Sequence, residues 1–212
     1  MKDFFGCAAH CEWCAVDQYL DKEPSELRRM QNHWRTEGGS TPLHVLCYGL
    51  QSHNLYDKAH RLLEATNGAA ANHLTPEDGH PRRYTPLQTM GNRNITGSAQ
   101  VKWVDALVRN MTQASLLNTI LSSTNGTFAH MFASAGAQDS LKAALWACVD
   151  VHGEAFTWQL LHTPDSYGAG VVDRAFSNNK HFAFWIKDTF GAVELLTKKQ
   201  AEAMQLQKRA DR

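Results

Sequence analysis

The chain has 212 residues, 43% of them hydrophobic, which is enough to bury a continuous core in one domain. Its 21 Lys and Arg residues balance its 21 Asp and Glu residues, so no net field draws the protein to nucleic acid or to an anionic membrane. No apolar run approaches the roughly 20 residues that cross a bilayer, and the N-terminus lacks the pattern of a secretion signal. We therefore expect no nucleic-acid binding, no membrane span and no classical export.

Five cysteines, an odd number in a chain without a secretion signal, are typical of reduced thiols. We expect no disulfides and a cytoplasmic or nuclear location. A pathogen protein of this kind would instead reach a host cytosol by a non-classical route. Cys47 and Cys148 fall inside helix patterns, which favours burial over nucleophilic use, because reactive thiols need exposed electropositive sites.

The first predicted element is an N-terminal cap of two short helices within residues 1–20, rich in Ala, Cys and aromatic residues. Its Cys-x3-Cys-x2-Cys pattern at Cys7, Cys11 and Cys14 resembles the cluster-binding loop of radical S-adenosylmethionine enzymes, where three thiolates hold an iron–sulfur cluster. The same spacing places the three residues on one face of a helix, and free cysteine is a common buried hydrophobe. We favour the structural interpretation; the alternative is a zinc or iron–sulfur site at these cysteines and His10.

The next predicted element is a helix that opens at Pro24 or Ser25, in which Met30 and Trp34 form an apolar stripe four residues apart. Beyond it, helix-spaced apolar residues mark further helices up to residue 190, and the segment from residue 192 is a strong helix former. We expect most aromatic residues, including most of the six Trp, to lie in the core. The apolar residues that define the later helices are Ala59, Leu62, Leu63, Trp103, Val104, Leu107, Val108, Leu116, Leu117, Ile120, Leu121, Trp146, Val149, Phe156, Trp158, Leu160, Leu161, Phe182, Trp185 and Ile186.

One four-residue motif recurs through these elements. It is Thr-Pro-Leu-His at 41–44, Thr-Pro-Leu-Gln at 85–88 and Thr-Phe-Ala-His at 127–130. Thr is a good N-cap because its hydroxyl accepts a bond from an unpaired backbone N–H, and Pro in the next position loses nothing because its N–H would be unpaired there. We expect each copy to begin a helix, with the third residue in the core. The fourth residue would bond back to Thr, which gives His44 and His130 a structural role.

This motif and the residues that follow its third copy resemble the ankyrin-repeat family. After 127–130 the sequence continues with the rest of a first helix, a tight turn at Gly136 and a second helix, without insertion. Asp165 and Gly168 lie at the offsets that the family uses for its hairpin turn, before a further start at 170. A copy that has lost its opening letters begins at residue 3.

The starts at residues 3, 41, 85, 127 and 170 lie 38, 44, 42 and 43 residues apart, whereas a standard ankyrin unit has about 33 residues. We assign part of the excess to long connections within units two and three, and the rest to fingers or extra helical turns between units. The predicted fold is an all-α solenoid of about five ankyrin-like helix pairs, with short hairpins or loops between units, over residues 1–198. Residues 199–212 would form a C-terminal capping helix or tail.

The resemblance implies protein–protein recognition, because a solenoid offers an extended concave surface. We expect a binding module of adaptor, effector or inhibitor type rather than an enzyme, with another protein as partner and no cofactor. Interface hot spots are enriched in Trp, Tyr and Arg, and we expect the hairpin tips to lie on one side of the molecule. The predicted partner-binding residues, all at or beside hairpins and loops, are Trp34, His80, Arg82, Arg83, Tyr84, Asp165 and Tyr167.

Overall fold

The computed structural model describes residues 23–33, 40–49, 53–74, 84–91, 98–119 and 126–191. Within these ranges there are eleven α-helices, one 3-10 helix and no strand, so the all-α prediction is confirmed for the part of the chain that is described. None of these helices has both the length and the apolar character needed to cross a bilayer. The helices are α3 (Pro24–His33), α4 (Pro42–Gly49), α5 (His53–Ala65), η1 (Ala69–Asn72), α6 (Pro86–Gly91), α7 (Ser98–Asn110), α8 (Gln113–Leu116), α9 (Phe128–Ala135), α10 (Gln138–His152), α11 (Glu154–His162), α12 (Val171–Asn178) and α13 (Lys180–Phe190).

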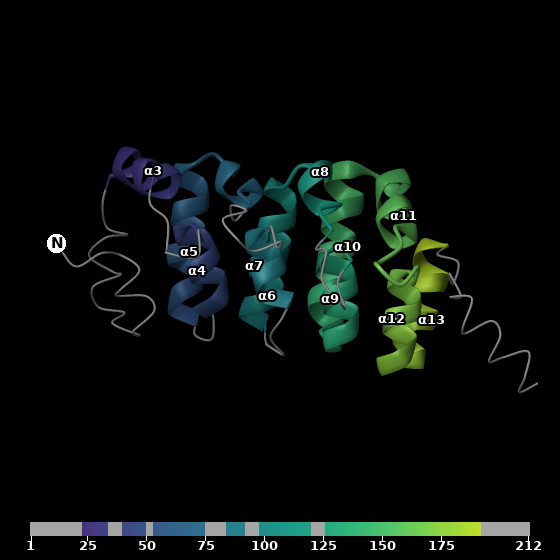
Figure 1. The fold of residues 1–212 in the computed structure, drawn as a ribbon. Coiled ribbons are helices and arrows are strands. Elements are labelled where there is room, and N and C mark those ends of the chain that lie inside the picture. The colour runs from purple at the N-terminus through teal and green to yellow at the C-terminus, as the bar shows by residue number, and fades with distance from the viewer. Residues whose placement is uncertain are drawn as a thin grey trace, which may run out of the picture.

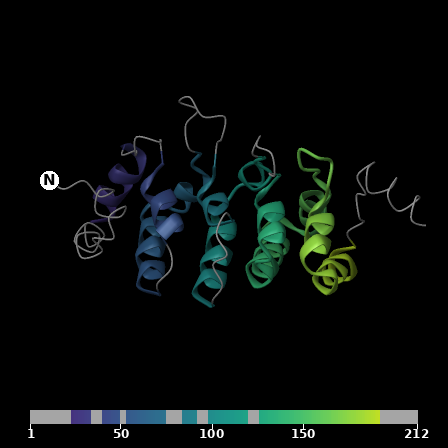
Figure 2. The same cartoon turned by 60° about the horizontal axis from the view of Figure 1, so that its bottom comes forward.

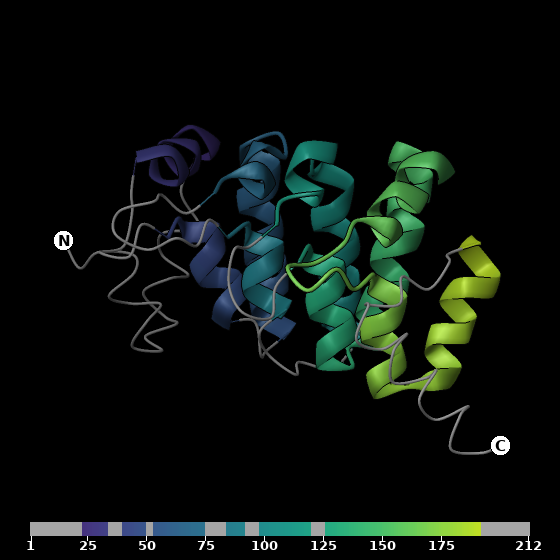
Figure 3. The ribbon, with the colours of Figure 1, turned by 45° about the vertical axis from the view of Figure 1, so that its right-hand side comes forward.

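The helices lie side by side in an elongated row (Figure 1). In one layer, which we name layer A, α4, α6, α9 and α12 pack each against the next. In the other, layer B, α5 packs on α7 and α7 on α10, and α13 extends this layer because the Phe190 ring lies 5.3 Å from that of Trp146 on α10. Each layer A helix also packs on the layer B helix that follows it in the chain. Figure 3 shows α12 and α13 together at the end of the row.

Short additional helices lengthen the connections between the pairs. The 3-10 helix η1 follows α5, α8 follows α7, and α11 follows α10 and packs on it. Along the upper edge of the row, α3, α8 and α11 lie in line (Figure 1). The insertions η1, α8 and α11 supply the extra helical turns expected from a spacing longer than 33 residues. The long connections expected within units two and three lie largely outside the described residues, as does the N-terminal copy.

The core follows the helix spacing of the apolar residues. All predicted layer B core positions from Ala59 to Val108 are buried. The Trp103 indole is fully buried, packs edge-on against Tyr56 with ring centroids 5.7 Å apart, and donates from Nε1 to Cys47 Sγ at 3.3 Å. Leu117 and Trp185 are partly buried at the edge of the core.

Among the Trp residues within the described ranges, two lie on the surface, contrary to the expectation that most aromatic residues in these helices are buried. Trp146 on α10 is 49% exposed and Trp158 on α11 is 50% exposed. The core face of α10 is already occupied by Leu141 and Leu145. Because consecutive residues on an α-helix point about 100° apart, Trp146 is turned away from the face that Leu145 buries.

Candidate functional site

The first helix start is built around His44. The backbone N–H of Thr41 donates to His44 Nδ1 at 3.3 Å, and the Thr41 hydroxyl lies 2.7 Å from the same nitrogen. Since Nδ1 accepts a bond, the neutral ring carries its proton on Nε2. This Nε2 donates to the carbonyl oxygen of Tyr84 at 2.8 Å. His44 therefore joins the start of α4 to the residue that immediately precedes the next start.

The second start uses a glutamine in the same way. Gln88 Oε1 accepts from the Thr85 backbone N–H at 2.9 Å, and Gln88 Nε2 donates to the carbonyl oxygen of Asn118 at 2.7 Å. The Asn118 amide also donates back to Gln88 Oε1 at 2.8 Å. An amide thus replaces the imidazole because it offers one acceptor and one donor on a side chain of similar reach.

The third start repeats the arrangement of the first. His130 Nδ1 accepts from the Thr127 backbone N–H at 3.1 Å, and Nε2 lies 3.1 Å from the carbonyl oxygen of Ala169. His130 is fully buried, and this burial lowers its pKa to about 4. The ring is therefore neutral at physiological pH. The predicted structural role of the two histidines is confirmed by these hydrogen bonds.

The fourth start begins at Gly170, which has no side chain to cap the helix. Asp173, three residues later, accepts a hydrogen bond from the Gly170 backbone N–H at 2.8 Å. A carboxylate at this position also favours the helix N-terminus through the helix dipole. The fourth start therefore has Gly instead of Thr at the N-cap, but the side chain in the third helical position, Asp173, still bonds back to the N-cap residue.

The turn over residues 163–170, which links α11 to α12, is organised by Asp165. Its Oδ1 accepts from the backbone N–H groups of Tyr167 and Ala169 at 2.8 and 2.9 Å. Its Oδ2 accepts from Arg174 Nε at 2.6 Å and from a second Arg174 nitrogen. Burial by itself raises the pKa of Asp165, but the bonds from Ala169 and Arg174 outweigh it and hold that pKa below its ordinary value. The side chain stays ionised and fixes the turn.

The 163–170 turn presents Tyr167 to solvent. The Tyr167 side chain is 57% exposed, and the guanidinium of Arg174 lies 5.4 Å from its ring centroid. Arg174 is itself held by the buried Asp165 carboxylate. The turn projects from one edge of the row (Figure 2). Asp165 therefore has an internal role in shaping the turn, while Tyr167 is the residue of this pair that is accessible to another molecule.

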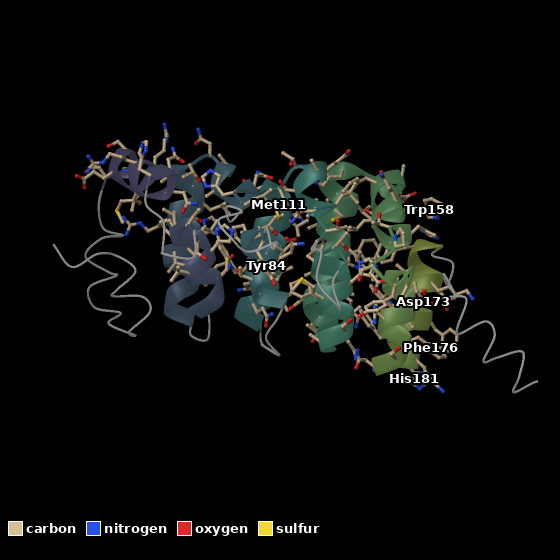
Figure 4. The ribbon with its side chains drawn as sticks, in the orientation of Figure 1. Tyr84, Met111, Trp158, Asp173, Phe176 and His181 are labelled. Atoms are coloured by element: carbon tan, nitrogen blue, oxygen red, sulfur yellow. The ribbon has the colours of Figure 1, made fainter. Side chains whose placement is uncertain are left out.

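Tyr84 is the only other predicted partner-binding residue within the described ranges. It is partly buried, and Figure 4 shows it near the middle of the row. The other predicted contacts, Trp34, His80, Arg82 and Arg83, lie outside the described residues. The structure thus brings Asp165 and Tyr167 together and adds Arg174, which the sequence did not single out because no motif links it to an acid nine residues earlier.

The cysteines divide into a described and an undescribed group. Cys47 and Cys148 are free and buried, as predicted, and burial raises the pKa of each thiol to about 12. Both are therefore protonated at neutral pH. The alternative metal site at Cys7, His10, Cys11 and Cys14 lies outside the described residues. Among the residues that are described, no group of three or more His, Cys, Asp or Glu side chains is placed to hold a metal ion.

A groove of about 490 Å³ runs along layer B between α5, α7 and α10, and its lining includes Tyr56, His60 and Lys102. Arg109 lies in this groove but is already paired with Asp105 at 2.9 Å and with Asp150 at 2.8 Å. An anion that entered would compete with both carboxylates for this guanidinium. The groove is therefore a weaker candidate for recognition than the 163–170 turn.

No family model matches this sequence, and no curated protein is significantly similar to it. The site with the best-defined geometry is the 163–170 turn, in which a buried acid and an ordered arginine support an exposed tyrosine. Such an arrangement is suited to contact with a macromolecule. It contains no nucleophile paired with a base.

Proposed function

We propose that this protein is an ankyrin-like solenoid that binds a partner protein through the edge of layer A from which the 163–170 turn projects. Two features of the described residues support the solenoid part of the proposal. Helices that begin 44, 42 and 43 residues apart, at Pro42, Pro86, Phe128 and Val171, pack each against the next in the order of the chain. The side chain in the third position of each helix bonds back to the residue before the helix.

The observation that carries the binding proposal is the presentation of Tyr167 on a turn held by Asp165 and Arg174. Tyrosine is enriched among interface hot spots because it offers a large amphipathic surface at a small entropy cost. A turn that is already fixed by two backbone bonds to Asp165 loses little further freedom when a partner binds. Because the turn is already ordered, binding of a partner would not have to be accompanied by new hydrogen bonds within the protein.

A second contact is expected beside Tyr84. His44 bonds to the Tyr84 carbonyl, and His130 bonds to the Ala169 carbonyl, in the same geometry. Tyr84 and Ala169 are therefore equivalent residues of two units, so Tyr84 lies at the same edge of layer A as the end of the 163–170 turn. The predicted contacts at His80, Arg82 and Arg83 precede Tyr84 directly in the sequence. A partner that spans this edge would contact both places.

The proposal is tested by replacing Tyr167 and measuring affinity. A tagged full-length chain first captures partners from its native source, and the affinity of each purified partner is then measured by calorimetry. We expect Tyr167→Ala to weaken binding by about 2 kcal/mol, roughly 30-fold, as loss of a hot-spot residue does. Trp158→Ala is a matched control, since Trp158 is exposed to a similar extent, 50% against 57%, but lies on α11 outside the turn. Equal affinities of wild type and Tyr167→Ala, with the fold intact, would exclude the turn as the binding site.

The loop before the third unit is tested in the same assay. Replacing Arg82, Arg83 and Tyr84 together by Ala should change the free energy of unfolding by no more than about 1 kcal/mol, as surface changes usually do. The triple variant should weaken partner binding by about 2 kcal/mol or more. If only this variant loses affinity while Tyr167→Ala does not, the partner contacts the earlier units alone.

A further inference from the structure

Two exposed aromatic rings lie together on α12 and α13, the two helices at the end of the row (Figure 3). Phe176 on α12 is 38% exposed, Phe184 on α13 is 47% exposed, and their ring centroids lie 6.1 Å apart, edge to face. Lys180 Nζ lies 5.4 Å from the Phe176 ring centroid. Adjoining apolar side chains that face water mark interaction sites more often than isolated ones.

Phe176 lies on the face of α12 that in an earlier unit contacts the following unit. His130, in the third position of α9, bonds to the Ala169 carbonyl of the next unit. Residues three positions apart share a helix face, and Ala133, three positions after His130, is 1% exposed in the contact between α9 and α12. Phe176 follows Asp173 by the same three positions, yet it is exposed. The equivalent face of α12 is therefore open to another molecule.

In layer A this face of a helix receives another helix. α6 packs on α4, α9 packs on α6, and α12 packs on α9. Cys47, three positions after His44 on α4, is fully buried, as Ala133 is on α9. Helices packed in this way lie about 8–10 Å apart. A helix therefore has the shape to fit the open face of α12, where Phe176 and Phe184 offer it two apolar rings.

The charged side chains beside the two rings are mainly basic. Lys180, Phe184 and Lys187 lie four and three residues apart on α13, so they share one exposed face. No ion pair among the described residues involves either lysine. The only acidic side chain of α13 is Asp188. A helix with carboxylates beside its apolar face would complement the two lysines.

A second copy of this face, or the chain's own C-terminal residues, would complement it less well. In a two-fold contact the lysines of one copy would approach those of the other. Residues 192–212 are also net basic, with five Lys or Arg against three Asp or Glu. These are Lys198, Lys199, Lys208, Arg209 and Arg212 against Glu194, Glu202 and Asp211. Like charges that face one another across an interface are unfavourable, so the charge of the face favours an acidic partner.

We propose that the α12–α13 face formed by Phe176, Lys180, Phe184 and Lys187 binds an acidic amphipathic helix of another protein. Apolar side chains of that helix would pack on the two rings, and its Asp and Glu side chains would pair with the two lysines. The apolar contact supplies most of the affinity, since exposed ion pairs contribute little, whereas the lysines determine which sign of charge is accepted. This inference does not depend on binding at the 163–170 turn.

Titration of the full-length protein with two synthetic peptides tests this proposal. The first is a helix-forming peptide of about 18 residues, built from Leu, Ala and Glu with Leu every three or four positions; the second has Lys in place of each Glu. We expect the Glu peptide to bind with a dissociation constant below about 1 mM and to shift the amide NMR signals of α12 and α13. The Lys peptide should bind at least about tenfold more weakly, because its charges repel the two lysines.

Three variants locate the contact. Phe184→Ser should weaken binding of the Glu peptide at least about tenfold, since it removes an apolar anchor. Trp158→Ser is its matched control and should leave the affinity unchanged, because Trp158 is exposed to a similar extent, 50% against 47%, but lies on α11. The double variant Lys180→Glu with Lys187→Glu should reverse the preference, so that the Lys peptide binds more tightly than the Glu peptide. Unchanged circular dichroism shows that each variant is folded.

Four outcomes would overturn the proposal. The first is equal affinity of the wild-type protein for the two peptides, or no binding of the Glu peptide. The second is an equal loss of affinity in Phe184→Ser and Trp158→Ser. The third is a dimer, seen by sedimentation, that Phe184→Ser dissociates, which would assign the face to a second copy of the chain. The fourth is binding to phosphatidylserine vesicles without binding to the Glu peptide, which would assign it to a membrane surface.

Discussion

Replacement of His130 tests how much the bond between successive units contributes to stability. In the wild-type protein this buried ring accepts from the Thr127 N–H and donates to the Ala169 carbonyl. His130→Ala removes both bonds and leaves the Thr127 N–H without this acceptor in a buried site, whereas the Ala169 carbonyl still accepts from the Asp165 N–H at 2.9 Å. His130→Gln supplies instead the amide that Gln88 uses at the equivalent position of another unit.

The expected magnitudes follow from the two lost bonds. Each of the two lost hydrogen bonds contributes about 1 kcal/mol, and the buried Thr127 N–H left unsatisfied costs about a further 1 kcal/mol or more. Since the ring is fully buried, the cavity adds to this cost. We therefore expect His130→Ala to lower the free energy of unfolding by about 3–5 kcal/mol. His130→Gln, which keeps a donor and an acceptor of similar reach, should lower it by about 1 kcal/mol.

Urea denaturation followed by circular dichroism at neutral pH measures both effects. The shape of the transition shows whether the variants still unfold in one step, which is needed for a single free energy. The reasoning is refuted if His130→Ala costs less than about 1 kcal/mol. It is also refuted if the Gln variant is as unstable as the Ala variant, because the two hydrogen bonds would then not be the source of the stability.

Three further outcomes are expected. The pKa of His130 is about 4 in the folded protein and 6.5 in the free side chain, so on acidification the unfolded chain takes up this proton first. The contribution of the neutral ring to the free energy of unfolding is complete above pH 6.5, and about 3 kcal/mol of it is lost between pH 6.5 and 4. This loss should be absent from the pH dependence of urea midpoints in His130→Gln, and an identical slope in both proteins would contradict it. Gly126→Ala should destabilise by about 1–3 kcal/mol, since its Cβ would lie 2.5 Å from His130 Nδ1. Gly168→Ala would meet no neighbouring atom and should cost about 1–2 kcal/mol of backbone strain at φ 78°. Thermal unfolding that shows Gly126→Ala to be as stable as the wild type would be inconsistent with this packing. Cys47 and Cys148 should resist alkylation in the native protein, because burial raises the pKa of each thiol to about 12. Rapid alkylation of either cysteine, detected by peptide mapping, would contradict this burial.

The helix starts and most of the core could be predicted from the sequence because both depend on local rules. Thr41, Thr85 and Thr127 precede helices in the structure, and the fourth residue of each motif bonds back as its chemistry requires. The burial of Ala59 and Leu62 follows from helical spacing alone. These features need no knowledge of distant contacts.

Other features depend on contacts between helices and were not predictable from spacing. Trp146 and Trp158 occur in apolar helices but face solvent, because the neighbouring helices cover other faces of α10 and α11. Asp165 lies at a predicted turn position, yet its burial depends on Arg174, which reaches it only after the chain has entered α12. The sequence predicted that Asp165 and Tyr167 would both contact a partner; the structure gives them separate positions, one inside the turn and one on its surface.

The most direct test of the central claim is a hydrogen–deuterium exchange footprint of the complex with a captured partner. The proposed binding edge predicts slower exchange at residues 163–170 and at the start of α6 after Tyr84 when the partner is bound. Amides of α7 and α10 in layer B should exchange at the same rate in the free and bound protein. Slower exchange in layer B alone, with the 163–170 turn unchanged, would contradict the account.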